Sequence, residues 1–329
     1  MYKDLTKEEK FYSNTNFKFS YSSLNKLLFS PSLFYKDYIL EDREVRTDKH
    51  LVEGKLVHCL LFEPENVNNK FNIVPGKSPS DNIIKVMQDM SFYTDAETLV
   101  LCKVEVVLDS LKTLNLFQSL KTDEQRIDKV VIPDNEPYWK FLSNTNVDVV
   151  DQDTMQKCAD KVEILKQNKD VMDLFKQQKT DFELDPIETH AEKYLKSELT
   201  GHSFGIHGYV DFYKVDHDKL EVSICDLKTT SKTISDFRET VDFYNYWLQA
   251  AIYCKLVYDT LGEKADEYTI KFKFVVIDKY QQVYVFDVTE DTLSGWADGL
   301  LGVIKVAAHH YDERNYQLPY DFLVGNIKL

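Results

Sequence analysis

The chain has 329 residues, of which 43% are apolar, 13% aromatic and 29% charged. This composition is typical of a globular protein and excludes collagen-like, low-complexity and disordered chains. The 40 basic and 55 acidic side chains give a formal net charge of −15. That charge argues against a protein that coats nucleic acid through a positive field over its whole surface, although it does not exclude a local basic strip.

No two of the five cysteines are closer than 29 positions, and their number is odd. The spacing therefore does not fit a zinc site, an iron–sulfur cluster or a disulfide framework, and a reducing compartment is expected. No apolar run approaches the roughly 18 residues of a membrane helix. The first residues also lack the apolar core of a signal peptide. We therefore expect a cytoplasmic protein that does not bind membranes.

The first 180 residues favour helices after an irregular stretch over residues 1–20. Ser20 is typical of an N-cap, and Pro31 fits the first turn of a second helix. Residues 51–62 predict a buried helix, and the stretches 80–120 and 151–178 carry apolar residues at helical spacing. We expect residues 1–180 to form a helical N-terminal region that packs on the rest of the chain as one compact unit.

Strand-like patterns begin at about residue 181. Residues 190–199 alternate loosely, and the stretches 205–215 and 220–229 predict a hairpin around a turn-like polar cluster. A long amphipathic helix follows over 233–259, then two strands and a last helix, over 268–277, 281–288 and about 290–311. This order predicts an α/β (α+β) fold in which residues 181–329 form a central mixed sheet flanked by helices, after an N-terminal helical extension.

Two carboxylates and an ammonium are expected to meet at the end of the hairpin opposite its turn. Asp211 lies in one strand, Asp226 follows fifteen positions later in its partner, and Lys228 shares a face with Asp226. Mg²⁺ prefers oxygen ligands and makes a bound water easier to deprotonate, while a lysine can stabilise the transition state. The Asp-x-Lys pattern alone also fits a solvated strand end, but charges in a buried strand need partners or a metal.

Other polar residues lie at spacings that bring them near this hairpin. Glu192 sits on the preceding strand, and Gln249 and Tyr253 share one face of the following helix. Gly54 and His58 share a face of an earlier helix. Each has a plainer explanation, because a helix histidine is often a hydrogen-bonded core residue and the Gln–Tyr pair fits packing equally well.

An aromatic set, Tyr244, Tyr246 and Trp247, lies at the same part of the long helix. These rings either stack on nucleobases or pack in the core, and packing is the default interpretation.

Taken in chain order, these residues resemble the motifs of the PD-(D/E)XK nucleases. The closer likeness is to exodeoxyribonuclease VIII-type (RecE-like) exonucleases of phages and prophages, over the stretch 21–253. The motifs are Gly54-x-x-x-His58, Glu192, Gly208-x-x-Asp211, Asp226-Leu227-Lys228-Thr229-Thr230 and Gln249-x-x-x-Tyr253. The segments SYSSLNKLLFSPSLFYKDY, EGKLVHCLLFEPE and FYNYWLQAAIYCKLV also resemble that group. The proline of the signature is missing, since Val210 precedes Asp211.

The resemblance implies a restriction-endonuclease-like core and a role for each motif residue. The principal metal ligands would be Asp211 and Asp226, joined by the Leu227 carbonyl, with Mg²⁺ as the cofactor and Mn²⁺ as an alternative. His58 would be a further metal ligand or a base close to the metal. Lys228 would be the catalytic lysine. Glu192 would position a second ion or a water, with Glu188 and Glu198 as nearby alternatives. Gln249 and Tyr253 would support the site and bind DNA, and Lys232 and Arg238 would be DNA-binding residues along the DNA path.

The resemblance further implies an Mg²⁺-dependent exodeoxyribonuclease that acts 5′→3′ on duplex ends. It would leave 3′ single strands for recombination, with a single-strand annealing recombinase as a partner, and would form a homo-oligomer. Two alternatives stay open. One is an endonuclease, or a nuclease for branched or single-stranded DNA, of the same fold. The other is a non-catalytic acidic protein that mimics DNA, which only the net charge supports.

Overall fold

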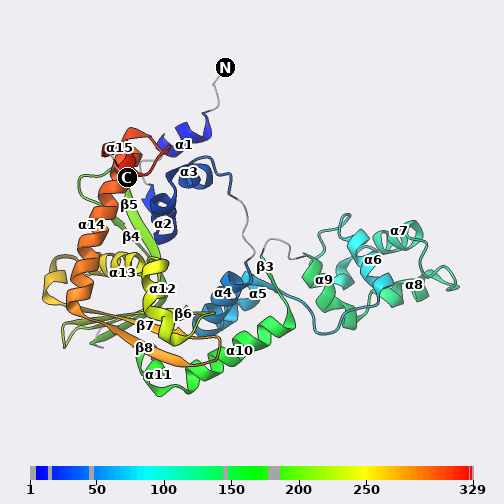
Figure 1. The fold of residues 1–329 in the computed structure, drawn as a ribbon. Helices are drawn as coiled ribbons and strands as arrows, with labels where there is room; N and C mark the ends of the chain where they lie inside the picture. Colours follow the sequence, from blue (N-terminus) through cyan, green and yellow to red (C-terminus); the bar gives the residue numbers. More distant parts are fainter. Residues whose placement is uncertain are drawn as a thin grey trace. The chain divides into compact units, whose positions relative to one another are not determined.

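The computed structural model describes residues 5–13, 17–43, 48–143, 147–176, 186–325 and 327 (Figure 1). The chain forms two compact units: residues 1–46 with 163–329, and residues 47–162. Within the described residues, no helix combines the length and the apolar character needed to cross a membrane.

A mixed six-stranded sheet is the centre of the first unit. Its strands are β1 (Lys18–Phe19), β4 (Ile187–Glu198), β5 (Gly205–Asp216), β6 (Glu221–Thr229), β7 (Thr269–Ile277) and β8 (Val283–Val288). The strand order is β1-β5-β6-β7-β8, and β4 pairs along the other edge of β5. The pairs β1–β5 and β6–β7 are parallel, and the remaining pairs are antiparallel.

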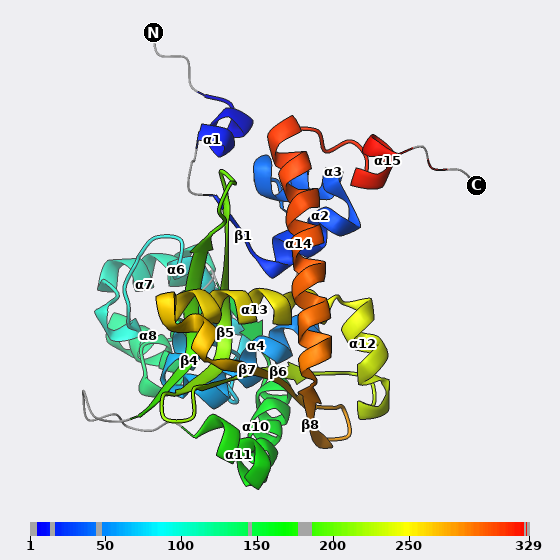
Figure 2. The ribbon, with the colours of Figure 1, turned by 90° about the vertical axis from the view of Figure 1, so that its left-hand side faces the viewer.

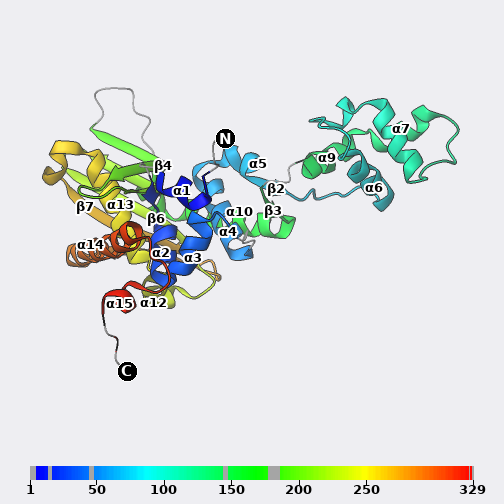
Figure 3. The same cartoon turned by 90° about the horizontal axis from the view of Figure 1, so that it is seen from above.

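Helices cover both faces of this sheet. One face shares a buried apolar cluster with α2 (Tyr21–Phe29), α13 (Tyr246–Thr260) and α14 (Glu290–Glu313). Figure 2 shows α13 crossing in front of β5, and Figure 3 shows α2 and α14 near one another. On the other face, Phe175 of α11 (Lys169–Phe175) packs edge-on against Phe212 of β5, with ring centroids 5.5 Å apart.

The remaining helices of the first unit are short. They are α1 (Lys7–Ser13), α3 (Pro31–Phe34), the π-helix η1 (Tyr35–Ile39), the 3₁₀ turn η5 (Ile234–Asp236), α12 (Phe237–Phe243), the 3₁₀ segment η6 (Gly262–Glu267) and α15 (Tyr320–Val324). The predicted α/β fold with a central mixed sheet flanked by helices is therefore confirmed. The five strands predicted between residues 190 and 288 correspond to β4–β8, and the last predicted helix is α14.

The single helix predicted over 233–259 is wrong. The chain instead forms η5, α12 and α13, with a break at Tyr244 and Asn245. Asn245 has a φ of 55° and a ψ of 40°, a left-handed conformation that asparagine tolerates better than most residues and that a continuous helix cannot contain. The Asn245 side chain stabilises this turn, because its Oδ1 accepts a hydrogen bond from the Trp247 indole at 3.1 Å.

The irregular stretch predicted over residues 1–20 also differs from the structure. Residues 1–4 and 14–16 lie outside the described part of the chain, but the rest contains α1 and β1. Phe19 of β1 is fully buried, and its ring lies 5.0 Å from that of Phe204. The N-cap prediction at Ser20 is confirmed, since its hydroxyl accepts a hydrogen bond from Ser23 N in a capping box.

Helices α13 and α14 approach closely at Gly299. A Cβ atom placed on Gly299 would lie 2.9 Å from the Trp247 ring, whereas one on Gly295 or Gly302 of the same helix would meet nothing within 4 Å. The absence of a side chain at Gly299 therefore allows the indole to lie against the backbone of α14.

The second unit is mostly helical. Its elements are α4 (Lys49–Phe62), η2 (Pro64–Asn66), α5 (Val67–Lys70), β2 (Phe71–Ile73), α6 (Asp81–Met90), η3 (Leu99–Leu101), α7 (Val104–Thr113), α8 (Asp123–Val130), η4 (Pro133–Asn135), α9 (Glu136–Ser143) and β3 (Asp148–Val150), and α10 (Gln152–Gln167) spans its boundary. Buried residues of α6 to α9 pack around Trp139. The parallel pair β2–β3 was not expected from the sequence.

Candidate active site

Three carboxylates lie side by side across β4, β5 and β6. Glu192 is opposite Asp211, because the β4–β5 pairs on both sides of this position keep one register. Asp226 occupies the position just beyond the last β5–β6 pair and so also lies opposite Asp211. The sheet therefore places the three acidic residues in one row. The row lies at the end of the β5–β6 pairing that is farther from the turn.

The backbone is irregular at this row. Glu192 has a φ of 47°, the left-handed region that is rare for a residue in a strand. On β5, Val210 and Tyr213 belong to the same buried cluster although they are three positions apart, so the alternation of sides shifts by one residue around Asp211. Such local distortions re-aim side chains and are frequent beside active sites.

Asp211 is fixed against β6 by a backbone hydrogen bond. Its side chain is buried, and Oδ2 accepts a hydrogen bond from Leu227 N at 2.8 Å. A hydrogen bond to an ionised acceptor is stronger than one between neutral groups, so it holds the carboxylate in place. The assignment of the Leu227 carbonyl as a metal ligand stays a prediction.

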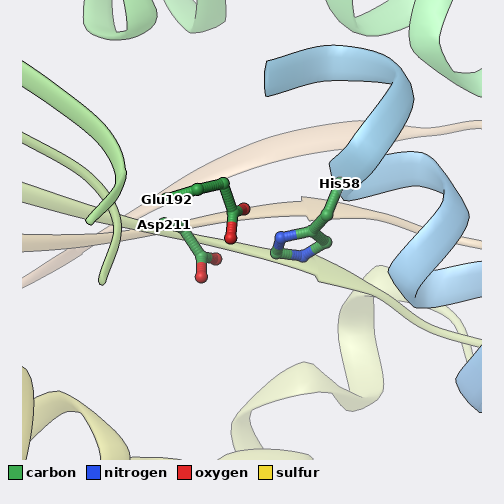
Figure 4. Close-up of side chains that lie close together, drawn as sticks. All are labelled: His58, Glu192 and Asp211. Carbon is green, nitrogen blue, oxygen red and sulfur yellow. The ribbon is translucent and has the colours of Figure 1, made fainter. Parts of the chain in front are cut away.

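Glu192 and Asp211 can hold a divalent ion between their carboxylates. One ligand oxygen of each residue lies within 4.8 Å of that of the other (Figure 4). His58, the further ligand that the sequence suggests, stays a prediction. Carboxylate oxygens are the ligands preferred by Mg²⁺ and Mn²⁺. The donor set thus fits a divalent cation, as the sequence analysis expected, without selecting which one.

Asp226 forms an ion pair with Lys228. The Lys228 ammonium lies 2.6 Å from Asp226 Oδ2, the Asp226 side chain is fully buried and that of Lys228 is 13% exposed. Burial by itself would lower the pKa of Lys228, but the carboxylates of Asp226 and Asp211 outweigh it and raise the pKa above its usual value. Lys228 is therefore a fixed positive charge beside the acidic row. The role of Asp226 as a metal ligand stays a prediction.

A hydrogen-bond chain on α13 supports the lysine. Lys228 Nζ donates to Gln249 Oε1 at 2.8 Å, and Gln249 Nε2 donates to the Tyr253 hydroxyl at 2.7 Å. Tyr253 is 6% exposed and packs where Gly208 leaves room, since a Cβ there would lie 3.1 Å from its ring. Burial raises the pKa of Tyr253 far above its ordinary value and keeps the hydroxyl protonated. The structure thus places both residues behind Lys228, and their contact with DNA stays a prediction.

The other predicted residues lie around this centre. Lys232 follows β6, with its ammonium 5.3 Å from the centroid of the Phe243 ring, and Arg238 is exposed on α12. Glu188 and Glu198 belong to other positions of β4 and pair with His217 and Lys18, respectively. Glu192 is the glutamate of this strand that lies in the acidic row.

Tyr246 was missed as a neighbour of the lysine, and Tyr21 was missed as a residue of this region. The Lys228 ammonium lies 4.6 Å from the centroid of the Tyr246 ring, within the range of a cation–π contact. The sequence contains a signal for this contact, because Tyr246 precedes Gln249 by three positions and shares its helix face. Burial, with the nearby Tyr246 and Asp226, raises the pKa of Tyr21. Tyr21 comes from α2 and donates a hydrogen bond to the Tyr244 carbonyl, and local spacing gives no indication of this long-range contact.

Comparison with known proteins gives no family for this chain. No protein-family model and no curated protein matches it. A similar solved structure is the crystal structure of a "Putative exonuclease" from Eubacterium rectale, with 12% identity, a TM-score of 0.48, and coverage of 99% of this chain and 96% of that one. A likeness this distant does not support a conclusion about function, which therefore depends on the residues of the site.

Proposed function

We propose that the chain is a divalent-metal-dependent deoxyribonuclease that hydrolyses the phosphodiester bonds of DNA. The observation that carries this proposal is the acidic row across β4–β6 with a buried lysine beside it. Glu192 and Asp211 offer metal ligands within 4.8 Å of one another, and His58 is the further ligand that the motif order suggests. Lys228 lies 2.6 Å from Asp226, the third member of the row. Hard oxygen ligands beside a fixed ammonium suit the stabilisation of a phosphate that gains negative charge.

Each side chain has a distinct task in this reaction. A bound divalent ion would supply an activated water and would neutralise charge on the phosphate. Asp211 presents a carboxylate that Leu227 N holds in one orientation. The Lys228 ammonium orients the attacking water and stabilises the negative charge that develops on the phosphoryl oxygens. Gln249 and Tyr246 keep this ammonium in position from α13.

The finer assignment is an exonuclease that uses Mg²⁺, acts 5′→3′ on duplex ends and leaves 3′ single strands. The order of the motifs, from Gly54-x-x-x-His58 to Gln249-x-x-x-Tyr253, supports it by resemblance. Lys232 and Arg238 would contact the DNA backbone beside the site. A single-strand annealing recombinase as partner and a homo-oligomer belong to the same proposal.

The test compares end-labelled linear duplex with covalently closed circular DNA, in Mg²⁺, in Mn²⁺ and in EDTA. The wild type should release nucleotides from the 5′-labelled end only when metal is present. Asp211→Asn, which keeps an acceptor for Leu227 N, should lower the rate by about 100-fold or more, the scale on which transition-state stabilisation is lost when one electrostatic group is removed. Asp216→Asn is the matched control, since Asp216 is also buried on β5 but pairs with Lys219 at the turn.

The outcomes separate the candidate functions. Cutting of the closed circle would replace the exonuclease with an endonuclease, and preference for single-stranded or branched DNA would assign that substrate class. Absence of metal-dependent hydrolysis by the folded wild type would reject a nuclease altogether. Equal rates for wild type and Asp211→Asn would reject the site assignment.

A further inference from the structure

A row of three aromatic rings leads from the catalytic lysine to the surface of the first unit. The Lys228 ammonium lies 4.6 Å from the centroid of Tyr246, which stacks on Tyr244 with a centroid distance of 5.5 Å and an interplanar angle of 26°. Phe243 meets Tyr244 edge-on, at 4.9 Å and 90°. We call Phe243, Tyr244 and Tyr246 the aromatic row.

The outer end of the aromatic row is open. Phe243 is 72% exposed and Tyr244 is 44% exposed, whereas Tyr246 is partly buried. A single exposed aromatic side chain needs no explanation. Two adjoining exposed rings beside a buried lysine, in contrast, form an aromatic surface large enough for a ligand. The ammonium of Lys232, 5.3 Å from the Phe243 centroid, adds a positive charge at its rim.

Helix α2 holds this surface in place. The Tyr244 carbonyl accepts hydrogen bonds from the Tyr21 hydroxyl and from Asn25 Nδ2. Asn245 Nδ2 donates to Asn25 Oδ1 at 2.7 Å, and Asn245 supplies the left-handed turn that separates α12 from α13. The break in the predicted helix therefore has a consequence at the surface, because it turns Phe243 and Tyr244 outward beside the site.

We propose that Phe243 and Tyr244 bind one unpaired nucleobase of the strand whose phosphate lies at Lys228. This inference rests on the proposed nuclease function and adds a base-recognition site to it. Aromatic rings that stack with bases, next to lysines that contact the backbone, are the usual means of holding single-stranded nucleic acid. Nucleotides follow one another by about 3.4 Å along a strand, so the steps of 4.6 and 5.5 Å from Lys228 to Tyr244 place the bound base within about three nucleotides of the bound phosphate.

The geometry favours a single base over a base pair. Because Phe243 stands at 90° to Tyr244, the two rings form a corner in which one base stacks on one ring and meets the other at its edge. The partner base of a pair would extend beyond this corner. The strand that enters the site is therefore expected to be frayed at its end, and a duplex with an unpaired terminal nucleotide should be a better substrate than a blunt one.

The first experiment measures binding with Ca²⁺ in place of Mg²⁺, using duplexes that carry 2-aminopurine as an unpaired terminal base. Stacking should quench the fluorescence of the probe on wild-type protein. Phe243→Ala and Tyr244→Ala should each abolish the quenching and weaken binding by about 5- to 150-fold, the range expected for loss of one base–aromatic stack. Tyr244→Phe, which keeps the aromatic ring, should quench the probe and bind the duplex as the wild type does. Phe322→Ala is the control, because Phe322 is 56% exposed on α15 and lies outside the aromatic row.

The second experiment replaces the terminal nucleotide by an abasic one. Wild type should bind the abasic duplex as weakly as Phe243→Ala binds the intact one, and the two changes together should cost little more than either alone. Independent, additive losses would overturn the inference, as would equal quenching by wild type and Phe243→Ala. If the wild type cleaves DNA with metal yet shows these results, only the base site is wrong. If it does not cleave, the nuclease proposal fails, and the fluorescence still shows whether a base stacks here.

Discussion

The ion pair between Lys228 and Asp226 should show strong coupling in a double-mutant cycle. Lys228→Met removes the ammonium that lies 2.6 Å from a fully buried carboxylate. Breaking a buried pair by removing one partner typically costs about 3–5 kcal/mol, because the remaining charge is left in an apolar environment. We expect Lys228→Met to lower the free energy of unfolding by this amount in EDTA, where no metal ion can compensate.

Asp226→Asn should cost less than Lys228→Met. The Lys228 side chain keeps 13% of its surface exposed, and it retains its contacts with Gln249 and Tyr246. We expect a loss of about 1–3 kcal/mol, the usual cost of leaving a buried polar group unsatisfied. With both charges removed no unpaired charge remains, so the double variant should be more stable than the sum of the single losses predicts, by about 2 kcal/mol or more.

Urea unfolding, followed by circular dichroism and by tryptophan fluorescence, measures these differences. Two of the three tryptophans, Trp247 and Trp296, lie in the first unit and report on it. Lys219→Met is the matched control: Lys219 pairs with Asp216 at 2.8 Å in the same hairpin, but its side chain is 72% exposed. Asp216 is itself buried, but it keeps the hydrogen bond from the backbone N of position 219 at 3.0 Å, so Lys219→Met should cost about 1 kcal/mol or less. Additive losses in the cycle, or a Lys228→Met loss no larger than that of the control, would show that the pair is not electrostatically coupled in the way argued.

Two further measurements test packing and pH dependence. Gly299→Ala should destabilise the chain because its Cβ would meet the Trp247 ring. Gly295→Ala should instead raise the stability by up to about 1 kcal/mol through helix propensity. Thermal unfolding that ranks the two variants in the opposite order would contradict this packing. The pKa of His310 is lowered by burial and, to a lesser extent, by the neighbouring His309. These effects outweigh the hydrogen bond to the Asn315 carbonyl, which raises the pKa. Protonation of His310 therefore favours the unfolded chain. The free energy of unfolding should therefore fall as the pH drops from 7 to 5, by at most about 1.4 kcal/mol per pH unit from this group. His310→Asn should reduce this dependence on pH. An unchanged dependence would show that another group causes it.

Much of the fold could be predicted because the buried strands carry their own signals. The stretches that became β5 and β6 are rich in β-formers and are separated by a polar turn, so both the hairpin and the position of Asp211 opposite Asp226 follow from local pattern. The extended pattern of β4 placed Glu192 on a neighbouring strand. The mixed sheet with helices on its faces then follows from the order of the elements.

The details that shape the site were not visible in the same way. Glu192 has a left-handed φ of 47°, and a glutamate in a strand-like pattern does not predict that conformation. Asn245 is a residue that tolerates it, but the apolar periodicity on both sides of Asn245 favoured one continuous helix. The hydrogen bond from Tyr21 to the Tyr244 carbonyl joins positions more than two hundred residues apart, and only tertiary packing determines it.

Lys228 connects the acidic row to the aromatic row, and its burial is better explained by chemistry than by stability. A buried ion pair contributes little net stability compared with apolar side chains of similar size. If the pair served stability alone, the double variant Asp226→Asn/Lys228→Met would lose stability in EDTA and would still cleave DNA with metal present. If the pair serves catalysis, the double variant should keep most of its stability in EDTA and yet fail to cleave DNA with metal present, because it lacks the ammonium and one carboxylate of the row. A double variant that stays folded and stable but does not cleave DNA is thus the result that distinguishes a catalytic pair from a structural one.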